Sequence, residues 1–500
     1  MNVPPVPGTR FFPVNRGEME ERGWAELDFL FVSGDAYVDH PAFGTAVIAR
    51  VLEAAGFRVG ILAQPDWRSR DAFLSMGRPR YAALVSAGNL DSMLNKLTAS
   101  KKSRSADSYS PGGQAGMRPD RATIAYCSRV KECWKDLPVI IGGVEASLRR
   151  FAHYDYWSDE VRRSILFDSQ ADLLVYGMGE LQIRQIADLL SRGVPVGCLK
   201  DLRGTVCRTN EFPEIRGKFV EIPSYEDVLS DKKRFAEAFR MQDAEQDAFH
   251  GKTVVQRHGA SFIVQNPPSP PLSMEEMDAV YALPKVKKVF IRSGIRFDYL
   301  MADKNGNFLE ELCAHHVSGQ LKVAPEHVSS RVLALMGKPG CEVYEKFRLA
   351  YAEMNEKLGK KQYLVPYFIA SHPGATLEDA VELAEYLRDI HFQPEQVQDF
   401  IPTPGSLSTC MYYTGLNPFT GEPVPSAKDR NERKMQRVLL QYAEPKNREA
   451  VIQALEAAGR KDLIGTGPSC LVQPQYREPQ KKSAPRPKGR TRSGKPDGRR

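Results

Sequence analysis

The chain has 500 residues, which is too long for one compact core, so about three domains are expected. Apolar residues make up 42% and charged residues 26%, which excludes a wholly disordered chain, a collagen-like fibre and a disulfide-stapled miniprotein. No stretch approaches the roughly 18 uncharged apolar residues of a membrane helix, and residues 1–22 lack the apolar core of a signal peptide. We therefore expect a cytoplasmic protein with no membrane contact.

The net charge of +7 is concentrated at the C-terminal end. Residues 471–500 hold ten Lys or Arg and two acids, so the rest of the chain has a net charge of −1. This basic tail is rich in Pro, Gly and Ser and lacks the apolar residues needed to fold. Two interpretations stay open: a solvated, disordered end, or a weak contact with RNA or another polyanion that does not depend on sequence.

After an N-terminal extension at 1–25, residues 26–210 alternate short apolar runs with helical patterns. This alternation predicts a doubly wound α/β domain around a parallel sheet. Ligands of such sheets bind at the carboxyl ends of the strands, although the glycines there also serve tight turns. The predicted strands are LDFLFVSGDA, FRVGILAQP, RYAALVSAG, PVIIGGVEA and ADLLVYGMGE, and the loops at that edge are 33–39, 86–89, 142–145 and 177–180.

Residues 211–284 differ in character and are predicted to be a connector, with a polar helix over 224–246 and prolines at 267–271. Residues 285–445 alternate again and indicate part of a βα barrel, followed by a further segment at 446–470. The predicted barrel strands are VKKVFIRSG, GQLKVAPEH, KKQYLVPYFIASHPG and PEQVQDFIPTPG.

Polar and charged groups gather at the ends of these barrel strands, where βα barrels place their active sites. They are Arg292, Arg296, Asp298, Lys322, Glu326, His327, Ser371, His372, Pro402 and Pro404. Salt bridges along the barrel rim are the structural alternative. A metal site would draw on His315, His316, His327, His372 and Glu326. Adjacent histidines on a helix point in different directions, so packing and hydrogen-bonding roles are favoured.

Cysteine spacing argues against a metal loop. The eight cysteines are Cys127, Cys133, Cys198, Cys207, Cys313, Cys341, Cys410 and Cys470, and none lies two or three residues from another. Zinc knuckles and ferredoxin-type loops use closely spaced cysteines, because a short loop must surround one centre. Most of these residues are predicted to be buried, reduced thiols.

The strings VSGDAYVDHPAFG and VFIRSGIRFDYL, with several others, resemble the YgiQ-type family of radical S-adenosylmethionine (SAM) proteins. This resemblance implies a cobalamin-binding-like N-terminal domain, a C-terminal radical SAM partial barrel, and SAM and a [4Fe–4S] cluster as cofactors. Substrate and electron donor stay unknown. The strings include VSGDAYVDHPAFG, IGGVEASLRRFAHYDYW, VYGMGE, VVQRHGASFIVQNPPSPPL, HHVSGQLKVAPEHVSSRVLALMGKPG, YLVPYFIASHPGATLEDAVELAEYLRD and QVQDFIPTPGSLSTCMYYTGLNP.

The chain departs from the family at two places. The family holds its cluster with a Cys-x-x-x-Cys-x-x-Cys loop after the first barrel strand, and this sequence contains no such triplet. Family-like sequence stops at Pro284 and resumes at Lys285, so the barrel is predicted to be incomplete, with at least about 30 residues missing. The cobalamin pattern Asp-x-His-x-x-Gly is not matched either, because Asp39 and His40 are adjacent, so cobalamin is doubtful.

By the same resemblance, five residues are the candidates for contacts with SAM: Arg296, Lys322, Glu326, His372 and Pro404. A guanidinium or ammonium suits the methionine carboxylate, and a glutamate suits the ribose hydroxyls or the amine. Three hypotheses stay open. The chain is a radical SAM protein that is inactive as written, a non-catalytic ligand-binding or scaffold protein, or the product of a gene model that dropped a segment of an active iron–sulfur enzyme.

Overall fold

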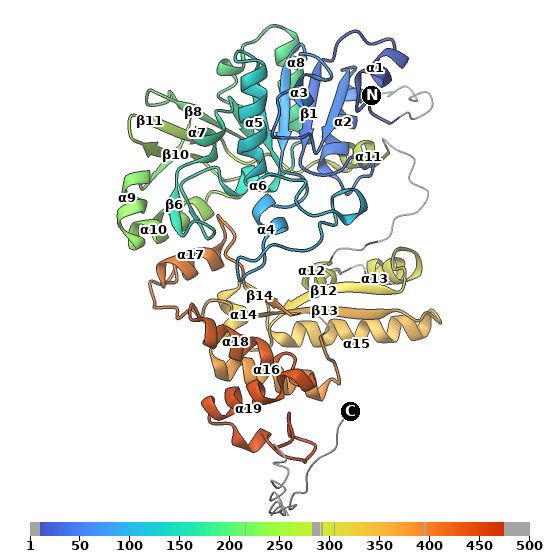
Figure 1. Ribbon diagram of the computed structural model, residues 1–500, viewed down its shortest axis with the longest axis vertical. Helices are drawn as coiled ribbons and strands as arrows, with labels where there is room; N and C mark the ends of the chain where they lie inside the picture. The colour runs from blue at the N-terminus through green and yellow to red at the C-terminus, as the bar shows by residue number, and fades with distance from the viewer. Residues whose placement is uncertain are drawn as a thin grey trace, which may run out of the picture.

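A computed structural model describes residues 11–282 except 216, and residues 291 and 294–474 except 305, 395 and 396 (Figure 1). The Pro284–Lys285 junction, most of the predicted strand VKKVFIRSG and most of the basic tail lie outside these residues. In the described part of the chain, no helix has the length and apolar composition to cross a membrane.

One nine-stranded sheet organises the N-terminal half, in the order β2-β1-β3-β4-β7-β8-β11-β10-β9. The first five strands are parallel, as the sequence predicts, and their order reverses direction between β1 and β3. The strands are β1 (Phe29–Ser33), β2 (Val59–Ala63), β3 (Ala82–Ser86), β4 (Val139–Gly142), β7 (Leu173–Val175), β8 (Thr205–Thr209), β9 (Phe219–Ile222), β10 (Thr253–His258) and β11 (Ser261–Gln265).

Helices cover both faces of this sheet, because alternate side chains of each buried strand point to opposite sides. In β1, Phe29 and Phe31 pack toward α2 (Gly44–Ala54) and α8 (Glu180–Ser191). Leu30 and Val32 join the other core, toward α3 (Asp71–Leu74), α5 (Ala122–Cys133) and α7 (Ile165–Ser169). The predicted doubly wound architecture is confirmed.

Residues 211–284 are not a separate connector. They supply strands β9, β10 and β11 to the main sheet, with β11 antiparallel to β8. The predicted helix over 224–246 is two helices, α9 (Tyr225–Ser230) and α10 (Lys232–Asp243). The break falls at Asp231, whose side chain accepts the Lys233 N–H and so caps α10. The segment ends in α11 (Met274–Ala282).

Smaller elements complete this half of the molecule. They are α1 (Arg16–Glu21), α4 (Ser92–Lys96), α6 (Gly143–Leu148), the hairpin of β5 (His153–Asp155) and β6 (Glu160–Arg162), and the short helices η1 (Pro111–Gly113) and η2 (Val196–Cys198). Helix α1 lies within the predicted N-terminal extension, and its Met19 is fully buried in the same core as Leu30. The extension is therefore partly built into the domain.

The C-terminal half contains a parallel three-stranded sheet, β12 (Gln320–Glu326), β13 (Tyr363–Ala370) and β14 (Gln398–Asp399). Leu321 and Val323 of β12 pack with Tyr344 and Phe347 of α15, and Phe368 of β13 packs against α16. This is the alternation of strands and helices expected of a partial barrel. The helices are α12 (Phe297–Ala302), α13 (Asn307–Glu311), η3 (Leu312–His316), α14 (Ser330–Leu335), α15 (Cys341–Lys357) and α16 (Leu377–Asp389).

The last helices join this half to its neighbours. They are α17 (Leu407–Thr414), α18 (Arg430–Leu439), η4 (Pro445–Asn447), α19 (Arg448–Ala457) and η5 (Lys461–Leu463). Val451 and Leu455 of α19 share a core with Val381 of α16, so residues 446–470 pack directly on the partial barrel. Helix α17 docks on the N-terminal half, where it lies beside α10 (Figure 1). Tyr413 of α17 stacks on Tyr154 with ring centroids 4.6 Å apart.

The close approach of β1 and β3 gives a first prediction. A Cβ atom on Gly34, which follows β1, would overlap the backbone carbonyl of Ala87, which follows β3. We expect Gly34→Ala to lower the free energy of unfolding of the N-terminal domain by about 1–3 kcal/mol. Urea unfolding followed by tryptophan fluorescence measures this, because all four tryptophans lie in that domain. Gly197→Ala, where a Cβ meets no atom within 4 Å, is the control, and equal midpoints for the two variants would contradict the prediction.

Candidate functional site

Arg296 and Asp298 bond to each other at the start of α12. The Arg296 Nε donates to Asp298 Oδ1 at 2.9 Å, and the guanidinium lies 4.2 Å from the ring centre of Tyr299. The Arg296 side chain is 63% exposed. This candidate for the SAM carboxylate therefore faces solvent with a carboxylate already beside it. Arg292, the other arginine of this region, lies outside the described residues.

Lys322 and Glu326 are two of the seven residues of β12. Lys322 is exposed, and its Nζ lies 5.8 Å from the ring centre of Tyr367 on β13. Glu326 ends the strand at a β-bulge with a φ of 67°, and its Oε1 lies 3.1 Å from Lys338 Nζ. Each candidate thus has its own partner, and the structure does not bring Lys322 and Glu326 onto one shared group.

His372 and Pro404 are buried near the contact between the two halves. Because a carbonyl only accepts, His372 Nδ1 carries the proton and donates it to Pro373 O at 2.8 Å, while Nε2 accepts from Ser408 Oγ at 2.7 Å. Burial lowers the pKa of His372 to about 4. Pro404 is buried, and the next residue, Gly405, lies against the backbone of Leu148 in α6. These residues therefore help to close the junction between the two halves.

The histidines do not form a metal site within the described residues. His327 Nδ1 accepts the backbone N–H groups of Val328 and Ser329 at 3.0 and 3.1 Å, which fixes its ring in place. The rings of His315 and His316 point apart, with centroids 6.4 Å from each other and an interplanar angle of 76°. Packing and hydrogen-bonding roles are thus observed for His327 and His372.

The thiols do not fit the iron–sulfur cluster that the family implies. All eight cysteines are free, and Cys313, Cys341 and Cys410 lie on three separate helices, η3, α15 and α17. Burial raises the pKa of Cys313 and Cys341 to about 11 and that of Cys410 to about 12. A cluster ligand must be deprotonated, so these environments favour the wrong protonation state.

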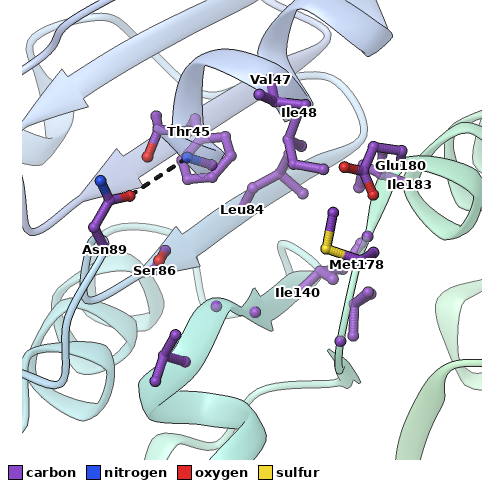
Figure 2. A pocket seen from close by; sticks show the side chains of 18 of the residues that line it. Thr45, Val47, Ile48, Leu84, Ser86, Asn89, Ile140, Met178, Glu180 and Ile183 are labelled. Atoms are coloured by element: carbon purple, nitrogen blue, oxygen red, sulfur yellow. Dashed lines mark hydrogen bonds between the residues drawn. The ribbon is translucent and has the colours of Figure 1, made fainter. Parts of the chain in front are cut away.

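A cavity of about 370 Å³ lies at the carboxyl ends of β3, β4 and β7, next to the reversal in strand order (Figure 2). Helices α2 and α8 form its walls, and Leu272 and α11 line it from the other side. Figure 2 shows Thr45, Ser86 and Asn89 at one end of the cavity and Glu180 at the other, with Ile48, Leu84 and Ile140 between them. A mainly apolar cleft with a few polar groups at its ends is typical of a small-molecule site.

The predicted sheet-edge loops contribute unequally to this cavity. Residues of the loops 86–89, 142–145 and 177–180 line it, whereas none of the loop 33–39 does. Glu145 points elsewhere, because its carboxylate accepts the backbone N–H groups of Ser92 and Thr123 at 2.8 and 2.9 Å. The sequence analysis did not predict that Met277 and Val280 of α11 line the cavity. Prolines at 267–271 precede this helix, and no sequence pattern indicates where the helix lies relative to the sheet.

Arg118 fixes the loops beside the cavity. Its NH1 donates to Ala87 O at 2.6 Å, and its NH2 lies 2.8 Å from Asp35 Oδ1 and 3.3 Å from Asp107 Oδ2. The other Asp35 oxygen accepts the backbone N–H of Asn89 at 2.7 Å. All three charged side chains are at most 4% exposed, and burial raises the pKa of Asp35. This network positions Asn89 at the mouth of the cavity.

Comparison with known proteins identifies the family. The chain matches the Radical SAM N-terminal family over residues 11–294 and a domain of unknown function, DUF3362, over residues 395–499. A UPF0313 protein of Clostridium botulinum (strain 657 / Type Ba4) is 45% identical and covers 92% of each chain. A UPF0313 protein of Clostridium perfringens (strain 13 / Type A) is 44% identical over 93% of this chain and 89% of its own length.

The chain therefore belongs to the radical SAM proteins, and within them to the UPF0313 or YgiQ type. A solved structure with a distant likeness is that of TsrM, a radical SAM methyltransferase from Kitasatospora setae with cobalamin and a [4Fe–4S] cluster bound. It is 11% identical, has a TM-score of 0.43 and covers 84% of this chain and 89% of that chain.

The Arg118 network gives a second prediction. We expect Arg118→Met to lower the free energy of unfolding by about 3–5 kcal/mol, because Asp35 and Asp107 are left buried without their cation. Arg192→Met is the matched control, since it breaks an exposed pair with Asp188 and should change stability by less than about 0.5 kcal/mol. Urea unfolding followed by tryptophan fluorescence measures both, and similar midpoints would refute the assigned role of Arg118.

Burial of His372 gives a third prediction. Its pKa of about 4 in the folded protein lies below the ordinary value of about 6.5, so between these values the unfolded chain takes up a proton that the folded chain does not. Stability is therefore lost as the pH falls from about 6.5 toward 4, by about 2 kcal/mol for this residue at pH 5.

Thermal unfolding of His372→Gln, followed by circular dichroism, checks this dependence. The midpoint of the variant should fall less between pH 7 and pH 5 than that of the wild type. The control is His250→Gln, because the His250 side chain is 89% exposed and its loss should leave the pH dependence unchanged. A His372→Gln profile parallel to the wild type would show that this imidazole does not contribute.

Proposed function

We propose that this chain is a radical SAM family protein that is inactive in SAM cleavage and keeps a small-molecule site in its N-terminal domain. The observation that carries the proposal is the lack of a Cys-x-x-x-Cys-x-x-Cys loop anywhere in the sequence. In the family, three clustered thiolates hold the cluster that supplies the electron for cleavage. With those ligands gone, no other group of cysteines in the described residues is arranged to replace them.

The length of the alignment with the relatives supports a missing internal segment. The alignment with the C. botulinum protein extends over 591 positions, whereas 92% of this chain is about 460 residues. About 130 aligned positions therefore face a gap in this chain. Placing this loss at Pro284 rests on the sequence itself, where the family-like strings stop before the expected cluster loop.

The contacts of the candidate SAM residues support the proposed loss of SAM cleavage, because side chains of this chain already occupy several of them. Arg296 is paired with Asp298, Glu326 lies beside Lys338, and His372 is engaged with Ser408. Lys322 is exposed and lies over the ring of Tyr367. Binding of SAM through Arg296, Lys322, Glu326, His372 and Pro404 stays part of the family-based proposal.

The N-terminal cavity supports a retained binding function. Its volume of about 370 Å³ falls within the range of small-molecule sites, and it lies where doubly wound sheets bind their ligands. Cobalamin remains doubtful as the ligand, because Asp39 directly precedes His40 and the spacing of the cobalamin pattern is not matched. In the fold, the Asp39 carboxylate accepts a hydrogen bond from Arg50. A cytoplasmic location and a contact of the tail 471–500 with RNA or another polyanion complete the proposal.

Cofactor analysis tests the proposed loss of activity. The chain and its C. botulinum relative are purified without oxygen, reconstituted with iron and sulfide, and incubated with SAM and dithionite. We expect no stoichiometric iron or sulfide and no 5′-deoxyadenosine from this chain, because the cluster has no ligands. Formation of 5′-deoxyadenosine by this chain would overturn the proposal. Sequencing the DNA across the Pro284–Lys285 codons tests the gene-model alternative, which predicts an in-frame segment there.

A further inference from the structure

Three exposed lysines from separate parts of the chain each lie over a tyrosine ring, beside the contact between the two halves. They are Lys101 in the loop after α4, Lys232 at the start of α10 and Lys428 just before α18. Their ammonium nitrogens lie 4.7 Å from the ring centre of Tyr156, 5.1 Å from that of Tyr413 and 5.0 Å from that of Tyr412, respectively. Within the described residues, none of the three lysines forms an ion pair with a carboxylate.

The tyrosines under these lysines belong to one connected cluster of aromatic rings. The ring centre of Tyr412 lies 6.0 Å from that of Tyr156 and 6.3 Å from that of Tyr154, which in turn stacks on Tyr413. Trp157 extends the cluster, with its ring centre 5.2 Å from that of Tyr156. Because Trp157, Tyr412 and Tyr413 are partly exposed, the surface presents aromatic rings and ammonium groups side by side.

Two of the ammonium groups are close enough to repel each other. Partial burial and the Lys232 ammonium lower the pKa of Lys428, and Asp159 opposes this shift only in part. The Asp159 carboxylate accepts a hydrogen bond from the Tyr154 hydroxyl at 2.5 Å and forms no ion pair with either lysine. An anion that contacts both lysines offsets their repulsion, so this arrangement favours the binding of phosphate groups.

A fourth cation, Arg433 of α18, extends the positive surface. Its NH1 donates to the Tyr156 hydroxyl at 3.3 Å. Asp429, the acid next to Lys428, caps α18, because its Oδ1 accepts two backbone N–H groups of that helix. The four cations outnumber Asp159 and Asp429, so the surface attracts an anion with several charges.

We propose that this junction surface binds a single-stranded nucleic acid. The cations contact its phosphates, and the partly exposed rings stack on its bases, which together are the features of surfaces that bind single strands without reading their sequence. The junction surface is separate from the N-terminal cavity and from the tail 471–500, so the inference goes beyond the proposed function. Its residues are Lys101, Trp157, Lys232, Tyr412, Tyr413, Lys428 and Arg433.

A matched pair of double variants tests the charge of the junction surface. Lys232→Gln with Lys428→Gln removes two of its cations. Lys346→Gln with Lys361→Gln removes two exposed lysines of the C-terminal half that form no ion pair, so it changes the net charge equally and is the control. Anisotropy of a fluorescein-labelled oligouridine of about 12 nucleotides measures binding to each full chain from about 50 to about 300 mM KCl.

Both the affinity and its salt dependence should change in the junction variant. We expect the dissociation constant to rise at least about tenfold at about 100 mM KCl, because two phosphate contacts are lost. The slope of log Kd against log[KCl] should fall by about 1.4, since each phosphate contact on a single strand contributes about 0.7. The control variant should stay within about twofold of the wild type, with an unchanged slope.

A further variant separates stacking from charge. Trp157→Leu keeps an apolar side chain but removes the flat indole ring. We expect it to weaken oligouridine binding at least about fivefold, because a base stacked on an aromatic side chain loses its platform. Binding of inorganic polyphosphate of similar length, measured by titration calorimetry, should stay within about twofold of the wild type. Circular dichroism confirms that each variant is folded.

The outcomes distinguish the junction surface from the basic tail. Equal losses in the two double variants would show that binding follows net charge or the tail, and would overturn the inference. A folded Trp157→Leu variant that binds oligouridine like the wild type would indicate a general polyanion surface and overturn the assignment to nucleic acid. Absence of oligouridine binding by the wild type overturns the inference without any variant. The N-terminal cavity takes no part in these measurements, so the proposed function stands or falls separately.

Discussion

The arrangement of the loops at the carboxyl edge of the main sheet depends on the ion pairs and hydrogen bond of the Arg118 guanidinium. This guanidinium joins Asp35 after β1, the Ala87 carbonyl after β3, and Asp107 in the long loop that follows. These loops diverge where the strand order reverses, so the sheet alone does not hold them together. One buried cation therefore fixes the edge beside which the cavity opens, and through Asp35 it also positions Asn89.

The two halves of the molecule differ in what their strand-end residues contact. In the C-terminal half, the strand before β12 survives in the described residues only as a bridge between Ile295 and Val323, and the polar candidates at the strand ends bond to neighbours. In the N-terminal half, the described residues form one nine-stranded sheet, and a mainly apolar cavity lies at the carboxyl ends of β3, β4 and β7. The described residues hold no group of His, Cys, Asp and Glu side chains placed to bind a metal ion, whereas the N-terminal half has a mainly apolar cavity at the carboxyl edge of its sheet.

The prediction from sequence was strongest where local patterns decide the structure. The five parallel strands were predicted close to their observed bounds, because an apolar run is a pattern within a few residues. The break at Asp231 and the placement of β9 to β11 were not predicted. A strand that pairs with a partner more than 50 residues away, as β11 pairs with β8, leaves only a weak local signal.

The sequence by itself determined the family, the doubly wound architecture and the lack of a cluster loop, because these depend on residue types and their order along the chain. Only the tertiary structure decided which residues at the strand ends line the cavity. It separated Glu180, which lines the cavity without a donor at Oε2, from Glu145, which is bonded to the backbone. Both follow strand ends that contain glycine, and the difference arises because the folded chain brings Ser92 of α4 and Thr123 of α5, 53 and 22 residues earlier in the sequence, against Glu145.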